Sequence, residues 1–215
     1  MPVGRVPYRS VVDLLRHELH ADDDEKTTML IRRLRRAKRR GWLTRPEFLA
    51  ACEWKSPRSR RWYEANSAAA IRRITRDALR TRSECRRMEL LQSLKGVSIP
   101  TASAIVTMVD PQRYGVIDIR VWQLLYALQA VQRKPRGIGF RVHDWDQYVA
   151  ILRHFARAFR TTARLVEITL FHCHRAWQHG TLYARSGDAA RGRATGTGRR
   201  GAASPPRDRG VYPRS

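Results

Sequence analysis

The sequence predicts an all-α protein, and three observations indicate this fold class. Apolar residues recur at spacings of three and four along most of the 215-residue chain, which is the period of an amphipathic helix. No stretch alternates apolar and polar residues for long enough to suggest a sheet. Residues that start and stop helices stand at the ends of the periodic segments.

The first part of the chain divides into helices at its capping residues. A first helix fits Val11 to His20, and the acidic run 22–24 suits the start of a second helix that ends near Gly41. The run Thr44-Arg45-Pro46-Glu47 matches a capping box that opens a third helix. The stretch 54–66, WKSPRSRRWYEAN, shows no periodicity, and we expect it to be irregular.

The rest of the chain also divides into helices and loops by its apolar spacing. A basic loop is expected over 131–143, before two longer amphipathic helices. The predicted helices of this part cover 67–81, 84–95, 100–109, the run VWQLLYALQ after Asp118, 144–160 and 162–179.

The charge of the chain indicates a polyanionic partner. Lys and Arg number 43 against 19 Asp and Glu, so the net charge is +24, too basic for an ordinary metabolic enzyme. Residues 186–215 read as a disordered basic tail of net charge +5, which leaves +19 on the predicted folded domain, residues 1–185. Nucleic acid is the polyanion we expect first, and an anionic membrane surface or an acidic protein is the second choice.

Other classes of protein are disfavoured. The three cysteines are widely spaced, which predicts a reducing compartment and no disulfide framework, iron-sulfur cluster or structural zinc site. His172, Cys173, His174 and His179 do not share a metal-binding spacing, so we expect no metal. No apolar run reaches membrane-spanning length and the N-terminus has no signal core, so we expect neither a membrane partner nor export. We expect a cytoplasmic, nucleoid-associated protein in a bacterium and a nuclear one in a eukaryote.

The most informative stretch is 89–126. A helix ends at Lys95, the three residues 96–98 form a tight hairpin, and a second helix opens at Ile99-Pro100-Thr101 with small residues after it. Small side chains let the two helices pack closely. The N–H groups at the second helix start point outward, where they can bind a phosphate without a charged side chain.

On these residues the sequence resembles the helix-hairpin-helix DNA glycosylase superfamily, the group of endonuclease III, the adenine glycosylases and the alkylbase glycosylases. The matched text is L-K-G-V-S-x-P-T-A-S-A, followed by V-I-D-x-R-V. In that family a catalytic Asp lies a fixed distance after the hairpin, and Asp118 stands 22 residues after Gly96. The match covers about a sixth of the chain, from Leu90 to Tyr126.

The resemblance implies an all-α fold of two lobes. Lobe A would span about 25–115 and contain the hairpin at 89–109, and lobe B would combine about 8–20 with 118–180. A nucleotide flipped out of the DNA would enter the cleft between the lobes, with Asp118 at its floor.

The resemblance also implies roles for individual residues. The carboxylate of Asp118 would stabilise the oxocarbenium character of the sugar and orient or deprotonate the attacking water. Lys95 is given a phosphate contact because it lies beside the hairpin. The hairpin residues that would grip a phosphate are Gly96, Val97, Ser98 and Thr101.

The sequence departs from the family at several points. The position of the Schiff-base lysine in bifunctional members holds Pro100, which has no amine, so the resemblance implies a monofunctional hydrolase acting on double-stranded DNA without a cofactor, as a monomer. Ser98 replaces the second hairpin glycine, which costs backbone freedom if that position needs a positive φ. The four-cysteine iron-sulfur loop is absent from the sequence.

Several residues keep an alternative interpretation. Asp118 is also a good helix N-cap, and Arg120 could contact a phosphate or pair with Asp118. Lys55 and Arg58 are further DNA-contact candidates in the aromatic and basic stretch 54–66. The run 32–40 holds seven basic residues, either as a solvated face or as a DNA contact. The rival functions are a non-catalytic nucleic-acid-binding protein and an RNA- or ribosome-associated protein.

Overall fold

The computed structural model describes residues 6–19, 22–179 and 182. This part of the chain is built from helices, which confirms the all-α class, and none of these helices is long and apolar enough to cross a membrane. The predicted tail, 186–215, lies outside the described residues. The helices are α1 Val11–Glu18, α2 Glu25–Arg40, α3 Arg45–Lys55, a 3₁₀ turn Pro57–Ser59, α4 Arg60–Glu64, α5 Ala68–Arg80, α6 Glu84–Gln92, α7 Ile99–Val109, α8 Ile119–Ala127, α9 Val142–Ala158 and α10 Ala163–Trp177.

Most helices begin at the capping residues that the sequence indicates. The side chain of Asp24 accepts a hydrogen bond from the N–H of Thr27 at 3.0 Å, and α2 ends at Gly41 in the left-handed conformation. Thr44 and Glu47 form the expected capping box at the start of α3. These starts and stops are local in sequence, so they could be predicted without the tertiary structure.

The prediction of an irregular stretch over 54–66 is wrong. Helix α3 continues to Lys55, Pro57 starts a 3₁₀ turn, and α4 follows at once. Proline is tolerated there because the first turn of a helix needs no N–H from it. Tyr63 of α4 is fully buried and packs edge-on against Phe48 of α3, so tertiary packing stabilises a helix too short to show a period.

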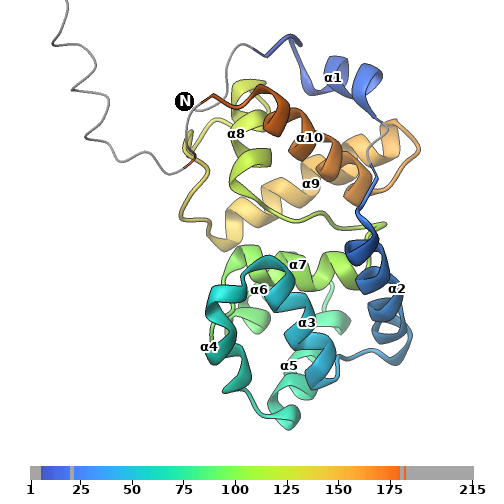
Figure 1. Cartoon of the computed structure of the whole chain (residues 1–215), viewed down its shortest axis with the longest axis vertical. Coiled ribbons are helices and arrows are strands. Elements are labelled where there is room, and N and C mark those ends of the chain that lie inside the picture. Colours follow the sequence, from blue (N-terminus) through green and yellow to red (C-terminus); the bar gives the residue numbers. More distant parts are fainter. Residues whose placement is uncertain (1–5, 20–21, 180–181, 183–215) are drawn as a thin grey trace, which may run out of the picture. The chain divides into compact units, whose positions relative to one another are not determined.

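The helices form two groups around one central helix (Figure 1). Helices α2 to α7 form one group, in which α7 packs against α2, α3 and α6. Helices α1, α8, α9 and α10 form the other, in which α10 packs against the remaining three. Every residue of α7 except Pro100 is buried, so this helix forms the centre of the core rather than one wall of it.

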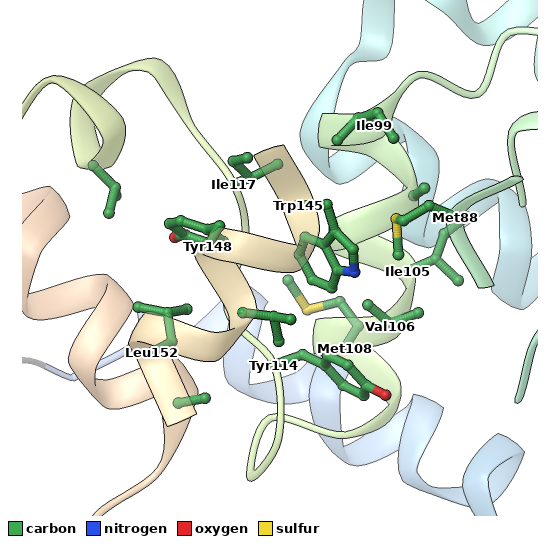
Figure 2. Packing of buried hydrophobic residues seen from close by; sticks show 14 of the residues in the cluster. Met88, Ile99, Ile105, Val106, Met108, Tyr114, Ile117, Trp145, Tyr148 and Leu152 are labelled. Carbon is green, nitrogen blue, oxygen red and sulfur yellow. The ribbon is translucent and has the colours of Figure 1, made fainter. Parts of the chain in front are cut away.

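The two groups share an aromatic core between α7 and α9. Figure 2 shows Trp145 and Tyr148 of α9 beside Met108 of α7 and Tyr114, which follows α7. Trp145 is fully buried and stacks on Tyr114 at 6.0 Å between ring centroids. This packing covers the chain segment that runs from α7 to α8.

The turn between α6 and α7 requires glycine at Gly96. Its φ is +83°, and a Cβ there would lie 2.7 Å from the Cβ of Trp62. Gly41 has the same φ of +83°, but no atom lies within 4 Å of the corresponding Cβ position. The two glycines therefore share the same backbone strain and differ only in the space around them.

We expect Gly96→Ala to destabilise the protein more than Gly41→Ala. Left-handed backbone strain costs both variants about 1–2 kcal/mol. The overlap with Trp62 adds about 1–3 kcal/mol at Gly96 alone. Equilibrium urea unfolding measures both losses, and equal values would show that the neighbours of Gly96 move aside without cost.

Candidate functional site

The segment between α7 and α8 is held by side chains from three helices. The N–H of Ile117 donates to the Oγ of Ser103 in α7 at 3.1 Å. The C=O of Val116 accepts from the hydroxyl of Tyr148 in α9 at 2.8 Å, and its N–H donates to the carboxylate of Glu167 in α10. Because these backbone groups are all satisfied inside the core, the residue that follows them has a fixed position.

That residue is Asp118, and its carboxylate bonds to two partners. It is the N-cap of α8, and its Oδ1 accepts a hydrogen bond from the N–H of Arg120 at 2.9 Å. Its Oδ2 accepts from the Nζ of Lys55, at the end of α3, at 2.5 Å. The Asp118 side chain is 21% exposed and that of Lys55 is 18% exposed, so both are largely shielded from water. Sequence reasoning placed Lys55 on a DNA-contact surface, whereas its ammonium group lies on Asp118.

The surroundings of Asp118 favour its charged form. Burial acts to raise the pKa of Asp118, but the charge and hydrogen bond of Lys55 and the N–H of Arg120 outweigh it, so the pKa falls below its ordinary value. The carboxylate is therefore ionised at neutral pH, as stabilisation of a developing positive charge requires.

A pocket of about 540 Å³ opens beside this ion pair, between the two groups of helices. Its lining combines the aromatic side chains of Trp54 and Phe171 with eight charged residues. The segment before α2 and helix α3 contribute Asp22, Asp23, Asp24, Trp54 and Lys55. The segment before α8 and helix α10 contribute Val116, Asp118, Arg164, Glu167, Ile168, Phe171, His172 and Arg175.

A second ion pair, between Arg164 and Asp23, lines the same pocket. Arg164 of α10 donates to Asp23 with Nη2–Oδ1 at 2.5 Å and Nε–Oδ2 at 3.2 Å, and its guanidinium lies over the ring of Trp54 at 5.6 Å. Arg164 also pairs with Glu167. Burial raises the pKa of Glu167 although Arg164 opposes the shift, so the two pocket carboxyl groups of Glu167 and Asp118 are shifted in opposite directions.

The hairpin is fastened by Asn66, a residue that the sequence did not single out. Its Oδ1 accepts from the N–H of Lys95 at 2.8 Å, and its Nδ2 donates to the C=O of Lys95 at 3.1 Å and of Tyr63 at 3.0 Å. Asn66 is buried, so these bonds replace water for each of its polar atoms. In the sequence Asn66 resembles any asparagine in a turn, which is why it was missed.

The hairpin residues divide into exposed and buried ones. Lys95, Gly96 and Ser98 are exposed, whereas the side chains of Val97 and Thr101 are buried. The N–H of Val97 donates to the C=O of Leu94 at 3.2 Å, so of these two residues only Thr101 can offer its N–H to a phosphate. Ser98 has φ −94°, so its replacement of a family glycine causes no backbone strain. Its Oγ contacts the Oγ1 of Thr101 at 3.1 Å and makes no cap bond, which leaves the first N–H groups of α7 outside side-chain capping.

The other predicted DNA-contact side chains, those of Arg58 and Arg120, are not part of the pocket lining. Arg58 is exposed on the 3₁₀ turn, beyond the pocket lining. The guanidinium of Arg120 contacts Gln178 and lies 5.7 Å from the ring centre of Phe171, so only the backbone N–H of Arg120 bonds to Asp118. Trp62 is 50% exposed beside the hairpin.

The histidines of α10 have separate surroundings. His174 is fully buried, and its Nε2 lies 2.9 Å from the Oε1 of Gln123 in α8. His172 lines the pocket. Within the described part of the chain, no group of three or more His, Cys, Asp or Glu side chains could hold a metal ion.

Comparison with protein-family models, curated proteins and solved structures finds no match to this chain. What the site can do therefore follows from its own chemistry. An ionised carboxylate, a neighbouring ammonium group and aromatic walls meet in one pocket, and Gly96 and Ser98 are exposed at one end of α7. This set of groups can stabilise a cationic reaction centre and bind a planar ring.

We expect His174 to make the protein less stable in acid. Burial lowers the pKa of His174 to about 4 from an ordinary value of 6.5; the charge of Arg120 adds to this and that of Asp118 opposes it. Between these values the unfolded chain binds a proton that the folded protein does not, so falling pH costs up to about 3 kcal/mol, and at pH 7 nothing is lost.

The comparison variant is His174→Gln, which keeps a polar side chain without a titrating ring. Urea unfolding from pH 7 to pH 4 would show a steeper loss of stability for the natural protein than for the variant. Parallel curves would contradict a neutral, buried His174.

Proposed function

We propose that this protein is a monofunctional DNA glycosylase that hydrolyses the N-glycosidic bond of a damaged or modified base. The observation that carries the proposal is the ionised Asp118 in the wall of a pocket that Trp54 and Phe171 also line, 22 residues after the hairpin Gly96. The charge of +24 supports double-stranded DNA as the substrate because it favours contact with phosphates.

The chemistry of base removal fits these groups. Loss of the base develops positive charge on the deoxyribose, and a nearby carboxylate lowers the energy of that state. Asp118 can also orient or deprotonate the attacking water, whose oxygen forms the new bond to C1′ as the bond to the base breaks. Trp54 and Phe171 provide flat apolar walls for a flipped base, in a pocket within the usual size range of small-ligand sites.

The arrangement of the helices supports a two-lobed, glycosylase-like fold. The pocket lies between the group of α2 to α7 and the group of α1 with α8 to α10, and the hairpin joins α6 to α7. The exposed residues of the hairpin, Gly96 and Ser98, with the first turn of α7, would bind a phosphate next to the flipped nucleotide. The tail at 186–215 would add sequence-independent affinity.

Hydrolysis without a covalent intermediate fits the position of the amines. Pro100 has no amine at the place where the resembling family carries its Schiff-base lysine. Lys55 does lie in the pocket, but its ammonium group is bound to the carboxylate of Asp118. We therefore assign Lys55 the role of keeping Asp118 ionised.

One observation favours the alternative of a non-catalytic nucleic-acid-binding protein. The ion pair of Lys55 and Asp118 joins the two groups of helices and caps α8, which is a sufficient structural reason for both residues. In that case the hairpin and the basic surface would bind DNA while the pocket stays inactive.

The deciding experiment measures base release from duplexes that carry a panel of damaged and hypermodified bases. Hot alkali cleaves the strand at each abasic site, so cleavage that depends on alkali reports a monofunctional enzyme. We expect Asp118→Asn to lower the rate about 10²- to 10⁴-fold with unchanged DNA affinity. Binding by both proteins without release from any duplex would favour the non-catalytic alternative.

We expect Lys55→Gln to shift the acid limb of the pH–rate profile upward. Without the charge of Lys55, burial raises the pKa of Asp118, so the active carboxylate is lost at a pH about one unit or more higher. Lys55→Arg should restore most of the profile because it keeps a positive charge.

Lys134→Gln is the matched control. The Nζ of Lys134 lies 2.6 Å from the Oδ2 of Asp144, and neither residue lines the pocket. This control should leave the profile in place. Borohydride treatment during turnover should trap no protein–DNA complex; a complex lost in Lys55→Gln would instead identify Lys55 as an attacking amine.

A further inference from the structure

Helix α2 presents a row of arginines on its outer face. Its buried stripe is Ile31, Leu34 and Ala37, which turns the other residues of the run 32–40 outward. All seven basic residues of that run are exposed. Within the described part of the chain, no ion pair engages its arginines 32, 33, 35, 36 and 39.

Some of these arginines line a hollow of about 640 Å³ at the C-terminal end of α7. Its single acidic residue is Asp110, which pairs with Lys38 at 2.9 Å between Oδ2 and Nζ. The other basic residues of the hollow form no ion pair within the described part of the chain. They are Arg32, Arg35, Arg36 and Arg39.

A second hollow of about 570 Å³ adjoins the first, because Gln112 lines both. No acidic residue is among its lining residues. Its basic residues come from α9 and from the segments beside it. Of these, Arg153 bonds to Glu84 at 2.8 Å, whereas Arg157 and Arg160 are exposed. We call the two hollows together the α7-end surface.

The α7-end surface and the hairpin lie at opposite ends of α7. Gly96 precedes α7 and lies beside Trp62 of α4, whereas the two hollows share Gln112, which follows α7. An α-helix of 11 residues is about 16 Å long, so the two features are separated by about that distance. Contacts to DNA at the hairpin and at the α7-end surface therefore come from different residues.

We propose that the α7-end surface binds a second segment of duplex DNA. The proposal goes beyond base removal and does not depend on it. Nine basic residues line the two hollows, and Lys38, Arg113 and Arg153 among them pair with carboxylates. The other six form no ion pair within the described part of the chain and are more than the phosphates of one nucleotide could meet, whereas a phosphate backbone can contact several of them.

The residue types also suit a backbone. Arginines three or four residues apart on one helix face repeat about every 5.4 Å and offer paired N–H groups to phosphate oxygens. Such contacts carry no sequence information, so the second segment is bound as DNA rather than as a particular sequence. The protein then joins two duplexes, one at the hairpin and one at the α7-end surface.

The experiment tests whether the full-length protein bridges two duplexes. A duplex fixed to beads captures a second, fluorescent duplex only when one protein assembly binds both. The test variant carries Arg32→Gln, Arg35→Gln, Arg36→Gln and Arg39→Gln, and it keeps Lys38 for its pair with Asp110. We expect captured DNA to fall by about tenfold or more, with a clearly shallower dependence of capture on salt.

The matched control removes four exposed arginines elsewhere: Arg16→Gln, Arg73→Gln, Arg80→Gln and Arg82→Gln. It loses the same net charge, so we expect its capture to stay close to that of the natural protein. A second variant, Arg157→Gln with Arg160→Gln, tests the other hollow and should also lower capture. Thermal melting checks that each variant is folded.

Each outcome supports or overturns the proposal. Equal losses of captured DNA in the test variant and the control would mean that net charge alone binds the second duplex. If the natural protein captured no second duplex, the proposal of bridging would be wrong. Displacement of the second duplex by structured RNA at lower concentration would assign the surface to RNA instead. In the natural protein, bridging without base release would defeat the glycosylase proposal alone, and base release without bridging would defeat only this one.

Discussion

The structure depends on the burial of α7. All of its residues but Pro100 are shielded from water, and its small side chains let α2, α3 and α6 approach from different sides. A helix packed on so many faces has little freedom to shift, because its neighbours are held at the density of a protein interior. The hairpin at one end of α7 and the turn at its other end are therefore fixed relative to each other.

The same helix also sets the position of the candidate catalytic residue. Ser103 in α7 bonds to the backbone of Ile117, one residue before Asp118. Tyr148 and Glu167 hold the preceding residue from the opposite side. Precise placement of a single carboxylate thus follows from contacts to three helices.

Two shielded ion pairs across the pocket impose a second constraint on the structure. The pairs Lys55–Asp118 and Arg164–Asp23 both join the two groups of helices, and each is largely shielded from water. Removing one partner of such a pair leaves a poorly solvated charge, whereas the intact pair is satisfied. The pairs therefore brace the pocket and also set the ionisation of Asp118, so structural and chemical roles fall on the same side chains.

What the sequence by itself determined are the features set by neighbouring residues. Caps at Asp24, Thr44 and Asp118 and the glycine at Gly96 could be predicted, because their hydrogen bonds and backbone angles span only a few residues. Only the tertiary structure decided which side chains meet. Lys55 lies 63 residues from Asp118, and Asn66 lies 29 residues from Lys95, so no local pattern marks either contact. The helix at 60–64 was missed for the same reason: its stability comes from the burial of Tyr63 and not from its own sequence.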